Sequence, residues 1–141
     1  MIEPQTEVVE QAPEPVVVEP IPDYYLLVLT KLLESVSEDS SIGISFNVSG
    51  GLVYGNLITR GVWQKLWVSQ VSEANDFVGE VLTQITQSPE DDADEDDGDG
   101  LVRFVHLKNA TYVSGDTRYR MGLWRAPLAH IAGWSNSTPN E

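Results

Sequence analysis

Residues 88–100, "SPEDDADEDDGDG", carry eight acidic side chains and no basic one. Such dense like charge repels itself and cannot be buried, so this stretch is expected to be a solvated loop. Residues 1–22 hold five acidic side chains, no basic one and five prolines, which favours a disordered, extended arm. The folded domain must therefore be built from two blocks, which lie before and after the acidic loop. We predict one globular domain over residues 23–135, interrupted by the acidic loop, and a disordered tail over 136–141.

The formal net charge of −14 is concentrated in these two segments, which supply 5 + 8 = 13 of the excess negative charges. The rest of the chain has nine acidic and eight basic side chains and is almost neutral. Strong negative charge disfavours nucleic acid as a partner, because phosphates must be neutralised by Lys and Arg. The longest apolar run, at 24–29, is far shorter than a membrane span, and no signal peptide is recognisable, so we expect a cytoplasmic protein.

The first block, before the acidic loop, is predicted to form a helix, a β-hairpin and one or two further helices. Asp23 is placed as the N-cap of a helix of about fourteen residues. Residues 42–48 alternate apolar and small or polar side chains, and a Ser-Gly-Gly turn leads to a returning strand at 52–58, so this segment is predicted to be a β-hairpin. Residues 61–87 return to helical spacing, as one helix or as two broken near 73–76.

The second block predicts three strands, at 101–113 with a bulge at Asn109, at 118–125 and at 128–134. The whole order indicates an α+β fold. We expect an N-terminal helix and a small, strongly bent five-stranded antiparallel barrel or sheet of Sm-like or SH3-like type. A helical segment and the acidic loop would be inserted between strands two and three.

Three stretches together resemble the gas vesicle accessory proteins of the GvpU type. They are "GISFNVSGGLVYGNLIT", "FVHLKNATYVSGD" and the later "LWR", and the resemblance covers roughly residues 26–135. It implies a non-enzymatic protein that binds gas vesicles or assembles on itself to organise or cluster them. The implied partners are the gas vesicle shell or other accessory proteins, at the vesicle surface. The Pro/Glu-rich arm has no counterpart in that family, and the acidic insert is more extreme.

The sequence offers few groups for catalysis. His106 and His130 are the only histidines and there is no cysteine, so no metal site is predicted and no cofactor motif is found. His106 reads as a half-buried strand residue with a hydrogen-bond partner. We therefore expect no enzymatic activity, with a small enzyme kept as a third class because pockets are not visible in a sequence.

A basic and aromatic strand supplies the candidate interaction surface. Alternation along 118–125 places Arg118, Arg120 and Trp124 on one face, with Leu123 and Arg125 completing the candidate set. An Arg/Trp face could stack on bases, so an Sm-like RNA-associated protein is the alternative function. The other interpretation is a solvated strand face balanced by the acidic segments.

The last two predicted strands, 118–125 and 128–134, contain no proline and carry apolar residues on both faces. Exposed sheet edges of this kind pair readily with another copy. We therefore predict a homo-oligomer joined through these edges.

Overall fold

The computed structural model describes residues 23–37, 39–87 and 102–139. The predicted N-terminal arm, residues 1–22, and the predicted acidic loop, residues 88–100, lie outside the described residues, as do the last two residues of the predicted tail. The limits given above for the domain and its disordered ends therefore stay predictions.

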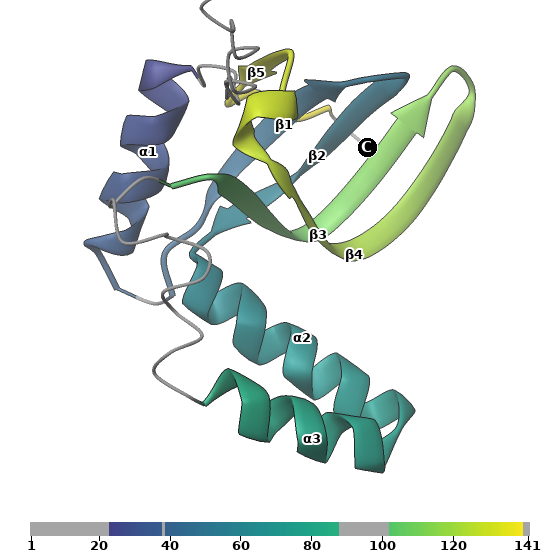
Figure 1. Cartoon of the computed structure of the whole chain (residues 1–141). Helices are drawn as coiled ribbons and strands as arrows, with labels where there is room; N and C mark the ends of the chain where they lie inside the picture. Colours follow the sequence, from purple (N-terminus) through teal and green to yellow (C-terminus); the bar gives the residue numbers. More distant parts are fainter. Residues whose placement is uncertain (1–22, 38, 88–101, 140–141) are drawn as a thin grey trace, which may run out of the picture.

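Three α-helices, five strands and one short 3-10 helix make up the described part of the chain (Figure 1). In chain order they are α1 (Tyr24–Glu34), β1 (Ile42–Val48), β2 (Gly51–Ile58), α2 (Arg60–Ala74), α3 (Asp76–Thr86), β3 (Phe104–Ser114), β4 (Thr117–Pro127), η1 (Leu128–His130) and β5 (Gly133–Ser135). This confirms the α+β class, the first hairpin and the two-helix form of the segment after it.

Each of the three α-helices begins at a side chain that accepts a hydrogen bond from its first turn. The Asp23 carboxylate accepts from the backbone N–H of Leu26 at 3.0 Å, as the sequence predicted for α1. Asn75 follows the last residue of α2 as its C-cap and is also the N-cap of α3, since its side chain accepts from the N–H of Val78 at 3.0 Å. The break between the helices therefore falls within the predicted 73–76 region.

The strands form one antiparallel sheet in the order β4-β3-β2-β1-β5. Within the described residues β4 pairs with β3 alone and β5 with β1 alone, so the sheet is open. The closed Sm-like or SH3-like barrel is accordingly not confirmed. One physical reason is that β5 is only three residues long, and its whole length pairs with residues 45–47 of β1.

The last predicted strand was placed too early. Residues 128–130 form η1, in which the N–H of Ile131 donates to the carbonyl of Leu128, and only residues 133–135 join the sheet. Leu128 is fully buried and anchors this turn in the core. Beyond β5 the chain still touches β1, because Ser45 Oγ donates to the Ser137 carbonyl at 2.6 Å and Asn136 Nδ2 donates to the Gly43 carbonyl at 3.1 Å.

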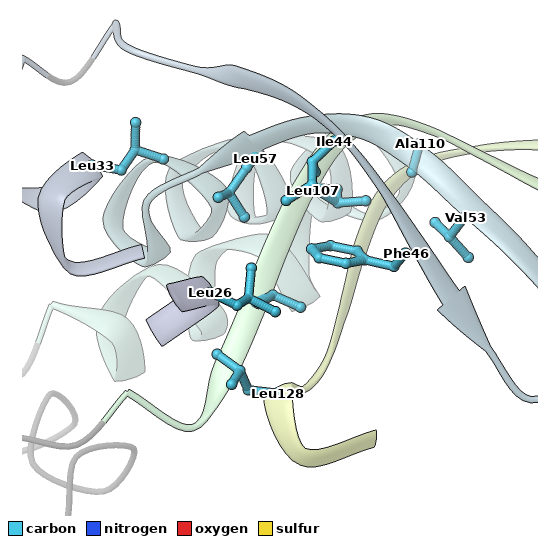
Figure 2. Close-up of a cluster of buried hydrophobic side chains, with 10 residues drawn as sticks. Leu26, Leu33, Ile44, Phe46, Val53, Leu57, Leu107, Ala110 and Leu128 are labelled. Carbon is cyan, nitrogen blue, oxygen red and sulfur yellow. The ribbon is translucent and has the colours of Figure 1, made fainter. Parts of the chain in front are cut away.

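The core lies on one face of the sheet, between the strands and α1. Phe46 sits at its centre, and Leu26 and Leu33 reach it from α1 (Figure 2). The other buried members are Ile44, Val53, Leu57, Val105, Leu107, Ala110 and Leu128. The opposite face of the sheet is left for α2 and for the candidate interaction surface.

Candidate interaction surface

The candidate surface follows β4, which is an edge strand of the sheet (Figure 1). Its first half is exposed, including Arg118, Tyr119 and Arg120. These residues lie just after the turn that joins β3 to β4, at the end of the sheet away from η1. An edge strand with exposed basic side chains is open to a partner along its length.

A backbone irregularity within β4 changes which side chains share a face. Gly122 has a positive φ of 76°, and the register with β3 shifts on both sides of the pair Ala110–Gly122. On the β3 side Asn109 also has a positive φ, of 55°, which agrees with the predicted bulge at that residue. A bulge adds one residue to the alternation, so side chains beyond it point to the other face.

Trp124 therefore does not share a face with the arginines, and the sequence-based prediction was wrong on this point. In register, Trp124 pairs with the buried core residue Leu107, and its ring stacks on Phe46 with centroids 6.1 Å apart. Strict alternation from Arg118 predicts that Trp124 lies on the same face as the arginines, because it does not allow for the extra residue at Gly122. Trp124 is a partly buried side chain that packs against the core.

The two arginines lie on the face opposite the core. Arg118 pairs with Val113 and Arg120 with Thr111, and these alternate with Tyr112, which packs against the core. Beyond the bulge, Leu123 and Arg125 flank the inward-facing Trp124 and so lie on this same opposite face. The outer face of β4, as we name it, consists of Arg118, Arg120, Leu123 and Arg125.

The Arg125 guanidinium joins this outer face to α2. It lies 4.1 Å from the ring centroid of Phe104 and 5.7 Å from that of Trp63 in α2. Contacts of this kind between a cation and aromatic faces are attractive, more so when water is partly excluded. Burial, and then the positive charge of Arg60, lowers the pKa of Arg125 below its ordinary value. Arg125 is therefore a positioning residue between α2 and the sheet as well as a surface residue.

His106 occupies the same contact from β3. It is buried, and its ring lies 5.4 Å from that of Trp63. Burial, and then the charge of Arg60, lowers the pKa of His106 from 6.5 to about 4, so the imidazole is neutral at pH 7. The sequence predicted a half-buried histidine, whereas α2 covers it almost completely. This imidazole holds α2 against the sheet.

Sequence reasoning did not predict which apolar side chains the helices leave at the surface. Tyr24, Tyr25, Leu32 and Val36 are exposed on and just after α1, and Phe77, Val78, Val81 and Ile85 are exposed on α3. The sequence does show that α1 and α3 each contain more apolar residues than a single buried face requires. The side of each helix that packs could not be assigned without the tertiary structure.

The described residues contain no group of three or more His, Cys, Asp or Glu side chains that could hold a metal ion. None of their helices combines the length and apolar character that crossing a membrane requires.

Comparison with known families gives one match. The model of the family described as "Gas vesicle protein GvpU-like" matches residues 23–138, which is 116 of the 141 residues. No curated protein and no solved structure matches the chain.

Proposed function

Because this chain belongs to the family of GvpU-like gas vesicle proteins, we propose that it is a non-enzymatic accessory protein of gas vesicles. It binds vesicles or assembles on itself, and in this way organises or clusters them. The observation that carries this proposal is the extent of the family match, which includes all three helices and all five strands. Its partners are the vesicle shell or other accessory proteins, and it acts in the cytoplasm at the vesicle surface.

The outer face of β4 is the contact surface in this proposal. It combines a sheet edge that no other described strand pairs with and the exposed side chains of Arg118 and Arg120. Clustered guanidinium groups bind carboxylates well, often through two parallel hydrogen bonds. The vesicle component that this face contacts should therefore present acidic side chains.

The buried position of His106, the side chain best suited to acid–base catalysis, supports a non-enzymatic role. His106 is the one histidine brought next to other functional groups, and it is covered by Trp63 and neutral at pH 7. A general base must reach its substrate, and this imidazole is occupied in packing α2. The loss of Trp124 from the outer face also removes the stacking platform that motivated the RNA-binding alternative.

Flotation with purified gas vesicles tests the proposal. The full chain is mixed with vesicles, the vesicles are floated by gentle centrifugation, and the protein in the floating layer is measured. We expect the wild-type protein to float with the vesicles. Replacing both Arg118 and Arg120 by serine should reduce the floated fraction at least about fivefold, because two charge-assisted contacts are removed.

The matched control is Lys31→Ser, which removes an exposed basic side chain from the last turn of α1, away from β4. This variant should float as the wild type does. A wild-type protein that remains wholly below the vesicles would overturn the proposed function. Equal losses in the Lys31 and the arginine variants would overturn the assignment of the surface to β4.

A further inference from the structure

We propose that α3 is a homodimer contact, in which the exposed apolar face of α3 packs antiparallel against the same face in a second copy of this chain. This inference deepens the proposed function, since it names a surface for self-association. Self-association is measured without vesicles, so this proposal can fail while vesicle binding is confirmed. Vesicle binding can equally fail while self-association is confirmed.

The apolar face is formed by four large side chains of α3. Phe77 is 74% exposed, Val78 47%, Val81 39% and Ile85 54%. At 100° per residue they fall within an arc of about 100°, which is the width of the buried stripe of an ordinary amphipathic helix. We call this arc the α3 stripe. A stripe of this width is normally covered by another element.

None of the described residues of the molecule covers the α3 stripe. On the other side of the helix, α3 packs closely on α2, where a Cβ at Gly79 would lie only 2.5 Å from the Cα of Ser72. Gln64 Nε2 of α2 also donates to the Thr86 carbonyl at 3.2 Å. α3 packs on α2 rather than on the sheet, and it lies on the side of α2 away from the strands (Figure 1). The stripe therefore faces outward from the molecule.

The composition of the stripe favours a second copy as its occupant. It contains no charged residue, so two copies meet without desolvating an ion pair. Two α3 helices that pack side by side along this stripe bury it, as neighbouring helices of a bundle bury their apolar faces. A contact between identical patches closes as a two-fold dimer and leaves no further copy of the patch open.

The distribution of charge selects the antiparallel orientation. α3 carries Asp76 and Glu80 in its first half, none in its second half, and is followed in sequence by the eight acids of 88–100. A parallel pair would place the attachment points of both acidic stretches side by side. An antiparallel pair separates these points by about 16 Å, the length of eleven helical residues, which exceeds the Debye length of about 8–10 Å. In the antiparallel pair, the acidic stretch of one copy begins near Asp76 and Glu80 of the other copy. In a parallel pair it would begin beside the eight acids of the other copy's stretch.

The same geometry fixes which residues face each other. The stripe runs from Phe77 to Ile85, with Val81 at its midpoint. In an antiparallel dimer Val81 therefore meets its own copy, and Phe77 of one copy meets Ile85 of the other. A parallel dimer would bring each residue against its own copy along the whole stripe.

Single-cysteine crosslinking distinguishes these arrangements, because the chain has no cysteine of its own. Under mild oxidation we expect Val81→Cys to form a disulfide-linked dimer. Phe77→Cys alone and Ile85→Cys alone should crosslink at least about tenfold less, whereas an equal mixture of the two should crosslink efficiently. Leu32→Cys, at an exposed apolar position of α1, measures random collision.

Sedimentation of uncrosslinked protein provides the second measurement. Two eleven-residue helices bury a small area, so we expect a weak dimer that appears as the concentration is raised to roughly 100 µM. Val81→Glu should lower the dimer fraction at least about tenfold. Leu32→Glu should leave the dimer fraction unchanged. Leu123→Lys should do so too, and it tests the rival contact through the sheet edges that the sequence predicted. Circular dichroism confirms that each variant is folded.

Several results would overturn the proposal. One is a monomer at every concentration, and a second is crosslinking of Val81→Cys no greater than that of Leu32→Cys. A third is a dimer that is lost in Leu123→Lys but kept in Val81→Glu. Strong crosslinking of Phe77→Cys and Ile85→Cys each to its own copy would show a parallel pair and overturn the orientation.

Discussion

His106 shows how one residue links the sheet to the helical hairpin. Its imidazole comes from β3, and it packs on the Trp63 ring of α2 beside the Arg125 guanidinium. Two positive groups, Arg60 and Arg125, are therefore close to a buried imidazole that would be costly to protonate. The packing therefore favours the neutral form of His106 over the protonated form.

Acid should accordingly weaken the protein through His106. In the unfolded chain this residue has its ordinary pKa of 6.5, whereas in the folded protein its pKa is about 4. Between these values the unfolded chain binds a proton that the folded protein does not, so the free energy of unfolding falls as pH decreases from 6.5 to 4. The loss is at most about 3 kcal/mol.

His106→Gln should remove this component, and urea unfolding at several pH values between 4 and 7 measures it. The control is His130→Gln, which changes the exposed histidine of η1 and should keep the wild-type pH dependence. If the slopes of the wild type and His106→Gln coincide, burial of His106 does not govern acid sensitivity.

At the residue scale, sequence reasoning assigned side chains to faces correctly wherever the strand was regular. It placed Arg118 and Arg120 together, and the structure does so too. It misplaced Trp124 because one residue at Gly122, with φ of 76°, reverses the alternation. Whether a glycine inside a strand makes a bulge depends on the register of the neighbouring strand, which a single sequence does not specify.

The helical hairpin is the element whose packing depends most on small residues. α2 and α3 approach where Gly79 meets Ser72, and both side chains there are among the smallest available. The sequence allowed one helix or two broken near 73–76, and Gly79 was its weak point because glycine is a weak helix former. It did not indicate that Gly79 is the contact with α2, since helical spacing alone does not say which side of a helix is covered.

Gly79→Ala should therefore destabilise the hairpin. A Cβ at this position would meet the Ser72 backbone and side chain, which forces the helices apart at a cost of about 1–3 kcal/mol. This exceeds the gain of about 1 kcal/mol that alanine brings to a helix. Hydrogen exchange of the α2 and α3 amides is expected to quicken, and the free energy of unfolding to fall.

Gly61→Ala is the matched control, because a Cβ at Gly61 in the first turn of α2 meets no atom within 4 Å. It should leave exchange unchanged or slow it slightly. If Gly79→Ala behaves like Gly61→Ala, the helices can separate without cost, and the close approach does not limit stability.

Over the whole molecule, the two proposed contacts lie on different elements. The outer face of β4 follows one edge of the sheet, whereas the α3 stripe belongs to a helix that lies on the side of α2 away from the strands (Figure 1). A two-fold dimer through α3 therefore carries two separate copies of the β4 face. Such a dimer can hold two vesicles at once, and many weak dimers between the same two vesicles add up through multivalency.

Clustering should then require both contacts, whereas binding requires only one. Val81→Glu is expected to float with vesicles as the wild type does, because its β4 face is intact, yet to cluster them several-fold less. The variant with serine at both Arg118 and Arg120 should neither float nor cluster. Light scattering and microscopy of vesicle suspensions measure clustering, and flotation of the same samples measures binding. Leu32→Glu, an equivalent change on α1, should retain both activities. If Val81→Glu clusters vesicles as strongly as the wild type, copies are bridged through another surface, and the edges of β4 and β5 become the first surfaces to test.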